Sequence, residues 1–208
     1  MKTVRGVVFD WGGVIIDEPS LDLQRFCSAR LGLAIDSGSA AIWRYLPMYQ
    51  EKRITERKFW EMVCDDCGQA KDVIPGASLW ADALRSVFRF RDDVVDAIRH
   101  LRVCGYKTGF LSNTEPEAAA FFHERQMDNW FDGAVLSCEV GVSKPHPEIY
   151  HMMAEQLALP CDTLLFLDDR QENIDGAHAV GMQAVRVSTT AAVRDVLRPL
   201  LQASFSRQ

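Results

Sequence analysis

The sequence predicts an α/β protein in which helices cover both faces of a parallel β-sheet and a helical segment follows the first strand. Short apolar runs alternate with amphipathic helical patterns through the second half of the chain. Each intervening helix returns the chain to the same edge of the sheet, so this alternation favours parallel strands. Between residues 17 and 90 the alternation stops, and only helical patterns are found.

The predicted strands are short apolar runs that end at polar or turn residues. They lack the alternation of a half-exposed strand, which indicates burial on both faces. The first, "VRGVVFD", is rich in valine and is followed by two glycines after Trp11. We expect strands at 4–10, 107–113, 133–137, 163–169 and 183–188.

The clearest helix of the second half follows the sequence "DDVVDAIRHLRVCG". Val94, Val95, Ile98 and Leu101 share one face, acids occupy the first turn, and Gly105 is suited to the position after the helix. Four further helices are expected at about 116–127, 147–158, 171–180 and 190–202.

The segment from 17 to 90 is predicted to be a helical insertion. Two clusters of turn residues, "AIDSGS" and "VIPGAS", separate its helical stretches. The stretches lie at 21–32, 40–50, 55–66 and 78–88. This divides the chain into a core domain, residues 1–16 and 91–208, and an inserted helical domain, residues 17–90.

Composition limits the function classes. The chain has 208 residues, 48% of them hydrophobic, and a formal net charge of −6, which argues against a nucleic-acid-binding surface. No apolar run approaches the roughly 18 residues of a membrane helix. The 6 cysteines are scattered, as is typical of thiols in a reducing compartment. We therefore expect a cytoplasmic protein, a monomer or weak homodimer, with a small-molecule partner and no nucleic-acid or membrane partner.

Polar residues cluster at the ends of the predicted strands. Ligands of open parallel sheets bind at the carboxyl ends of the strands, where the strand order reverses. Carboxylates are suitable ligands for Mg²⁺, whereas a hydroxyl, N–H groups at a helix start and an ammonium suit a phosphate. The combination predicts a metal that bridges to a phosphoryl group. The residues concerned are Asp10, Ser112, Asn113, Lys144, Asp168 and Asp169.

Four segments, in order, resemble the motifs of the haloacid dehalogenase (HAD) superfamily. They are "FDWGGV", "FLSNT", "VGVSKPHPEIY" and "LFLDDRQENIDGAHAVGM". The first and last are most similar to the branch that contains bacterial glucose-1-phosphate phosphatases. Each motif alone is weak evidence, but four in order form a strong joint signal. The resemblance implies a Rossmann-like core with a small helical cap, the insertion at 17–90.

The resemblance also implies a nucleophile and a metal site. Asp10 matches the family nucleophile, which attacks phosphorus and forms an aspartyl-phosphate that water then hydrolyses. Mg²⁺ would be held by the Asp10 carboxylate, the backbone carbonyl of Gly12 and Asp168, with Asp169 as a direct ligand or an indirect partner. The implied activity is a Mg²⁺-dependent phosphatase acting on a small phosphorylated metabolite.

Three further residues match the phosphate-binding positions of the family. The Ser112 hydroxyl and the Asn113 amide would hold phosphate oxygens. Lys144 would neutralise both the phosphate and the acidic cluster. Asn173, in the same motif as Asp168, is expected to order its loop rather than contact the substrate.

Gly12 departs from the pattern of most phosphatases in the superfamily. That position usually holds an aspartate that protonates the leaving alcohol and activates water, a contribution of about 10² to 10⁴ in rate. The chain has no side chain there. Either the substrate has a leaving group that needs little protonation, such as the anomeric oxygen of a sugar 1-phosphate, or another carboxylate substitutes. Asp17 is the candidate for the second possibility.

Two other functions stay open. A metal-independent haloacid dehalogenase also lacks the aspartate at this position, but paired acids such as Asp168 and Asp169 are hard to explain in a metal-free site for an anionic substrate. A catalytically silent HAD fold could act as a binding or regulatory protein. The presence of Asp10, Ser112, Lys144 and Asp168 argues against that reading.

Overall fold

The computed structural model of the chain describes residues 3–205 and the side chains of residues 3–202. Its centre is a five-stranded parallel sheet in the order β3-β2-β1-β4-β5. The α/β class with a Rossmann-like core is confirmed, and all five predicted strands are present. They are β1 (Gly6–Phe9), β2 (Lys107–Ser112), β3 (Gly133–Leu136), β4 (Leu164–Asp168) and β5 (Gln183–Arg186).

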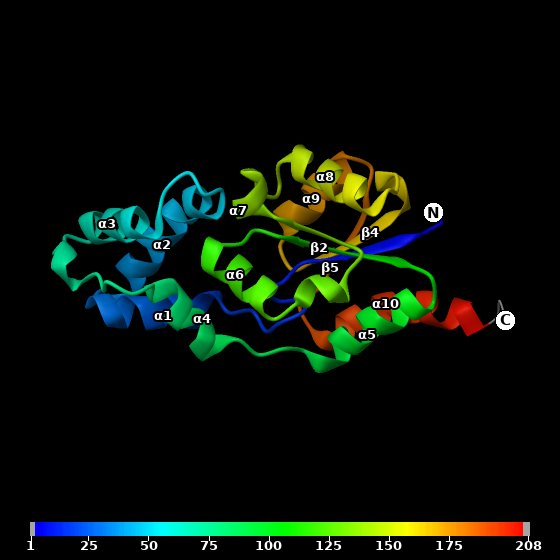
Figure 1. The fold of residues 1–208 in the computed structure, drawn as a ribbon, viewed down its shortest axis with the longest axis horizontal. Coiled ribbons are helices and arrows are strands. Elements are labelled where there is room, and N and C mark those ends of the chain that lie inside the picture. The colour runs from blue at the N-terminus through cyan, green and yellow to red at the C-terminus, as the bar shows by residue number, and fades with distance from the viewer. Residues whose placement is uncertain (1–2, 206–208) are drawn as a thin grey trace.

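Helices cover both faces of this sheet (Figure 1). On one face lie α5 (Asp92–Val103), α6 (Pro116–Glu124) and α10 (Thr190–Phe205), and on the other lie α8 (Pro147–Leu157) and α9 (Gln171–Ala179). This two-sided cover explains why the strands carry continuous apolar runs.

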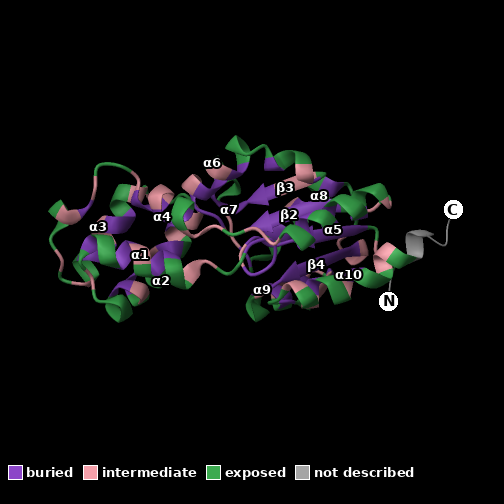
Figure 2. Cartoon of the chain, turned by 90° about the horizontal axis from the view of Figure 1, so that it is seen from below, coloured by how far each residue is buried: buried purple, intermediate pink, exposed green. Residues whose placement is uncertain are grey.

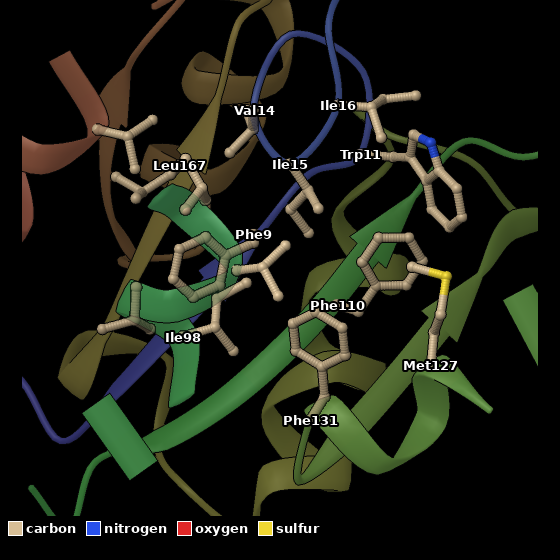
Figure 3. Close-up of a cluster of buried hydrophobic side chains, with 14 of the residues drawn as sticks. Phe9, Trp11, Val14, Ile15, Ile16, Ile98, Phe110, Met127, Phe131 and Leu167 are labelled. Carbon is tan, nitrogen blue, oxygen red and sulfur yellow. The ribbon is translucent and has the colours of Figure 1, made fainter. Parts of the chain in front are cut away.

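Strand β1 shows the two-sided burial most clearly. Val7 and Phe9 point into the core on the α5 side, and Val8 points into the core on the α8 side. All three side chains have no exposed surface. In the α5-side core, Phe9, Ile15 and Phe110 lie among the side chains drawn in Figure 3. Strand β1, which is followed directly by Asp10, is therefore packed against a hydrophobic core on each face of the sheet.

The inserted segment forms a bundle at one end of the elongated molecule (Figures 1 and 2). Its aromatic side chains, including Tyr49, Phe59 and Trp60, form a separate buried cluster. Its helices are α1 (Ser20–Leu31), α2 (Ile35–Gln50), α3 (Glu56–Asp66) and α4 (Leu79–Val87), with a 3-10 turn at Lys71–Val73.

The two connections between this bundle and the sheet lie side by side. The backbone N–H of Asp17 donates to the carbonyl of Arg89 at 3.0 Å, and that of Arg91 donates to the carbonyl of Ile15 at 2.9 Å. Residues 15–17 and 89–91 therefore form one short paired crossing into and out of the bundle.

One sequence expectation about the bundle is wrong. The cluster "AIDSGS" was expected to be a turn, but residues 35–39 form the beginning of α2. The Ser37 hydroxyl donates to the carbonyl of Ala34, and a side chain at Gly38 would collide with Ser28 of α1. The small residues thus allow α1 and α2 to pack closely, a tertiary effect that overrides turn propensity.

Four short elements were not predicted, one of them the 3-10 turn at Lys71–Val73 in the inserted segment. Helix α7 (Ser137–Val140) follows β3 directly, and 3-10 turns occur at Met127–Trp130 and Cys161–Thr163. None of the described helices is long and apolar enough to cross a membrane.

Candidate active site

The site lies at the carboxyl end of β1, where the strand order reverses. Strands β2 and β3 lie on one side of β1, and β4 and β5 lie on the other. The backbone N–H of Asp10 donates to the carbonyl of Leu167 at 2.9 Å, which holds the end of β1 beside the end of β4. A pocket of about 350 Å³ opens here between the sheet and the helical bundle.

Lys144 links the ends of three strands. Its ammonium donates to Asp10 Oδ1 at 2.6 Å, to Asp168 Oδ2 at 2.8 Å and to the carbonyl of Leu111 at 2.9 Å. These three bonds satisfy its three N–H donors, and only 4% of the residue is exposed. Lys144 is thus a fixed positive charge between two carboxylates.

The acidic residues form one cluster. One carboxylate oxygen from each of Asp10, Asp168 and Asp169 lies within 4.8 Å of the other two. Asp168 also accepts hydrogen bonds from the backbone N–H of Arg170 at 2.8 Å and from Asn173 Nδ2 at 3.0 Å. Asn173 therefore orders the loop, as its place in the sequence suggested.

Charge in this cluster is not balanced. Burial and the Asp168 carboxylate raise the pKa of Asp10 to about 7, against the lowering effect of Lys144. Burial, Asp168 and Glu18 raise the pKa of Asp169 to about 6. Burial alone would lower the pKa of Lys144, but Asp10 and Asp168 raise it above its ordinary value. Three acids and one ammonium leave a deficit of positive charge at neutral pH.

Two predicted phosphate ligands behave differently from each other. Ser112 lines the pocket, and its hydroxyl oxygen accepts a hydrogen bond of 2.6 Å from the Thr114 hydroxyl. The Asn113 side chain donates to the Lys144 carbonyl at 2.9 Å and accepts from the Lys144 N–H at 2.7 Å. Both ends of this amide hold the Lys144 loop, so Asn113 positions Lys144. Asn113 also lines the pocket, and its binding of phosphate stays a prediction.

The loop after β1 contains Trp11 and two glycines. Trp11 is 6% exposed and packs edge-on against Phe110, with ring centroids 5.1 Å apart (Figure 3). Gly13 has a φ of +73°, and a side chain there would come within 2.6 Å of Asp169 Oδ2. Gly12 lines the pocket beside Asp10.

Asp17 requires a correction, because the structure does not place it in the pocket. Its side chain is 66% exposed and forms an ion pair of 3.1 Å with Arg91. The next residue, Glu18, lines the pocket instead. A Cβ built at Gly12 would lie 3.9 Å from Glu18 Oε1, so Glu18 faces the space that a side chain at position 12 would enter.

A match over most of the chain decides the family. Residues 4–181 match the family model described as haloacid dehalogenase-like hydrolase. The chain belongs to the haloacid dehalogenase-like hydrolases. The superfamily named from the four motifs is thereby confirmed.

Two curated members of the family span nearly the same length. The chain is 25% identical to a D-ribitol-5-phosphate phosphatase from Bacteroides thetaiotaomicron, over 95% of this chain and 98% of the relative. It is 27% identical to a sesquiterpene phosphatase from Aspergillus oryzae, over 96% and 97% of the two chains.

Solved structures of HAD-family proteins share the fold. A predicted HAD-like hydrolase from Porphyromonas gingivalis superposes with a TM-score of 0.73 at 22% identity, covering 95% of this chain and 98% of that one. A HAD-family enzyme from Bacteroides thetaiotaomicron, in complex with magnesium and inorganic phosphate, gives a TM-score of 0.67 at 19% identity, covering 88% and 93%.

The sequence alone did not indicate several residues of this HAD-like site. Arg91 donates to the carbonyl of Gly13 and pairs with Asp17, so it ties the loop after β1 to the bundle connection. Glu115 is 8% exposed and accepts a hydrogen bond of 2.8 Å from Gln50 of the bundle. These contacts join segments that are more than 60 residues apart in the sequence, so no local sequence pattern predicts them.

Proposed function

We propose that this HAD-like hydrolase is a Mg²⁺-dependent phosphatase that hydrolyses a small phosphorylated metabolite through an aspartyl-phosphate on Asp10. The observation that carries the proposal is the setting of Asp10. Its Oδ1 accepts from Lys144, whereas no described residue donates a hydrogen bond to its Oδ2. Asp10 lines the pocket, and Oδ2 is the oxygen that would attack phosphorus.

The residues present fit a divalent cation. Three carboxylates meet within 4.8 Å and a single ammonium faces them, so a Mg²⁺ ion would correct the charge deficit. Asp10, Asp168, Asp169 and the Gly12 carbonyl are the groups that would hold it. When bound, Mg²⁺ would supply charge stabilisation for the phosphoryl group and reduce its repulsion from Asp10.

The residues around Asp10 then have separate tasks. Lys144 holds Oδ1 of the nucleophile and supplies positive charge where a phosphate would enter. Ser112, at the end of β2, offers its hydroxyl to a phosphate oxygen. Asn113 and Asn173 position Lys144 and Asp168 through the hydrogen bonds described above. The inserted segment, residues 17–90, acts as a cap that excludes water during the reaction.

Glu18 is the carboxylate best placed to replace the acid–base group missing at Gly12. It lines the pocket, and Ser20 donates to both of its oxygens through its backbone N–H at 3.1 Å and its hydroxyl at 2.5 Å. These bonds hold its carboxylate at the entrance from the core to the cap. Glu18 would protonate the leaving alcohol and then accept a proton from the attacking water. A sugar phosphate, whose leaving group is an alcohol, is one substrate compatible with this role.

The curated relatives support a phosphatase. A D-ribitol-5-phosphate phosphatase and a sesquiterpene phosphatase align over nearly their whole length. The solved structure of the same fold with magnesium and inorganic phosphate supports the metal and the ligand class. The net negative cluster disfavours a metal-free site for a haloacid carboxylate, and the intact Asp10–Lys144–Asp168 arrangement disfavours a silent fold.

Phosphate release from a panel of phosphorylated metabolites tests the proposal. We expect release with Mg²⁺, none with a chelator, and none from Asp10→Asn. Asp175→Asn is the control, because Asp175 is an exposed residue of α9 bonded to Gln171 and lies outside the pocket. Halide release from a haloacid without metal, or equal phosphate release by Asp10→Asn, would overturn the proposal.

A further inference from the structure

The end of helix α2 hydrogen-bonds the cap to the core. The Ser137 hydroxyl donates to the carbonyl of Gln50, the last residue of α2, at 2.7 Å. The Ser143 hydroxyl donates to Oε1 of Glu51, the next residue, at 2.6 Å. Both serines belong to the core, since Ser137 begins α7 and Ser143 directly precedes Lys144. The cap is therefore attached to the part of the core that carries Lys144.

One path of hydrogen bonds leads from this contact to Ser112. The hydroxyl oxygen of Ser137 accepts from the backbone N–H of Thr114 at 2.8 Å, and the Thr114 hydroxyl donates to Ser112 Oγ at 2.6 Å. All three residues are buried, and none is more than 3% exposed. Groups buried this deeply depend on one another for hydrogen bonds. A displacement of the Gln50 carbonyl would thus disturb the setting of Ser112.

A second path leads to Lys144. Glu51 holds Ser143, the residue before Lys144. The Asn113 side chain bonds both the N–H and the carbonyl of Lys144 itself. Gln50 Nε2 in turn donates to the carbonyl of Asn113 at 3.4 Å. The end of α2 therefore holds the two backbone segments that fix the direction of the Lys144 side chain.

These contacts do more than cover the pocket. Among the described residues, those that line the pocket do not include Glu51, Ser137 or Ser143, so their bonds contribute no contact to a bound substrate. A cap that only excluded water would need no bond to the segment that carries Lys144. Such a bond couples the position of the cap to the position of a catalytic charge.

We infer that Glu51 and Ser143 are positioning residues of this site, and that the site is complete only while the end of α2 is docked on the core. Docking holds Lys144, and through Ser137 also Ser112, where the phosphoryl group of a substrate would lie. Opening of the cap releases both residues, so a substrate that enters meets an incomplete site until the cap closes. This inference rests on the proposed function and adds a coupling between the cap and the chemistry.

Glu51→Met and Ser143→Ala test the coupling, because each removes the bond and leaves the pocket lining unchanged. We expect each variant to lower kcat/KM with Mg²⁺ about tenfold for both p-nitrophenyl phosphate and benzyl phosphate. The ratio of the two values should stay that of the wild type, since a shifted Lys144 acts on the phosphoryl group that both esters share. The double variant should lose no more than either single variant, because both changes remove the same bond.

Two further variants separate positioning from a general loss of structure. Glu51→Gln keeps an oxygen that accepts from Ser143, so we expect its kcat/KM to stay within about twofold of the wild type. Glu61→Met is the matched control and should match the wild type. Glu61 is a partly buried acid of α3 whose partner, Arg57 at 3.0 Å, lies within the cap. Equal kcat/KM in Glu51→Met and Glu61→Met, or a loss for only one of the two esters, would overturn the inference.

Backbone hydrogen exchange, measured by NMR without metal, keeps this inference distinct from the proposed function. The Lys144 N–H donates to Asn113 Oδ1 at 2.7 Å. We expect Glu51→Met to speed its exchange about tenfold and Glu61→Met to leave it unchanged. Unchanged exchange in Glu51→Met would overturn the coupling whatever the activities. If exchange rises but the wild type hydrolyses neither ester, the phosphatase proposal fails and the coupling of the cap to the Lys144 segment stands.

Discussion

The ammonium of Lys144 donates a 2.6 Å hydrogen bond to Asp10 Oδ1. The two residues are 134 positions apart, and only 1% of the lysine side chain and 11% of the aspartate side chain are exposed. The bond holds the carboxylate of Asp10, the proposed nucleophile, by one of its two oxygens. It is also a buried ion pair, so removing the lysine would leave carboxylates without compensation.

Lys144→Met tests this relationship. We expect the metal-free protein to lose about 3 kcal/mol or more of unfolding free energy, because Asp10 and Asp168 would be buried without their cation. Phosphatase activity should fall at least about 100-fold, since both the charge and the orientation of Asp10 are lost. Urea unfolding and phosphate release measure the two effects.

Lys107→Met is the control for that variant. Lys107 pairs with Asp132 at 3.2 Å, but its side chain is 53% exposed, and exposed pairs contribute little. Equal losses of stability and activity in the two variants would contradict the importance of the buried pair.

The effect of Mg²⁺ on stability should depend on pH. The pKa of Asp10 is raised to about 7 and that of Asp169 to about 6, so the folded metal-free protein holds protons that the unfolded chain releases. The protons bound by Asp10 and Asp169 therefore stabilise the folded state at low pH. This stabilisation is lost as the pH rises through 6 to 7. Mg²⁺ competes with these protons, so we expect its Tm increase to be larger at pH 8 than at pH 5.5. Sodium chloride at matched ionic strength is the control, and an equal Mg²⁺ effect at both pH values would contradict the assignment.

The strand ends were predictable because their signal is local. A buried parallel strand needs an apolar run, and its end is marked by the first polar residue, so Asp10, Ser112 and Asp168 were found from the sequence. The order of the strands then brings them together without further information. The cap was recognised as helical for the same reason, although its α2 begins earlier than its turn-like residues suggested.

The sequence could not resolve which side chains face the pocket. Asp17 and Glu18 are neighbours with the same charge, and only the paired crossing at residues 15–17 and 89–91 shows that Asp17 meets Arg91. Asn113 matches a phosphate-binding position, and only the folded structure shows that its side chain also bonds the Lys144 backbone. These contacts join distant segments, so they depend on tertiary packing rather than on local pattern.

Glu18→Gln tests the proposed acid–base group. We expect kcat to fall about 10²-fold for alkyl phosphates, whose alkoxide needs a proton, and far less for p-nitrophenyl phosphate. The ratio of the two rates is the measurement, and it separates proton transfer from a general loss of structure. Asp17→Asn is the matched control and should keep the wild-type ratio, because Asp17 is exposed and lies outside the pocket. The same ratio in both variants would remove Glu18 from the mechanism.

Gly13→Ala tests how closely the loop after β1 is fitted to the metal site. Gly13 has a φ of +73°, and a Cβ there would lie 2.6 Å from Asp169 Oδ2. Alanine therefore carries a backbone cost of about 1–2 kcal/mol and also displaces an expected metal ligand. Gly141→Ala isolates the first effect, since Gly141 has a φ of +75° and nothing lies within 4 Å of its Cβ position. We expect both variants to lose similar stability without metal, but only Gly13→Ala to weaken Mg²⁺ affinity, by about 10- to 100-fold. Titration of Mg²⁺ against Tm checks this, and equal affinities in the two variants would show that Asp169 can move away from the loop without leaving the metal.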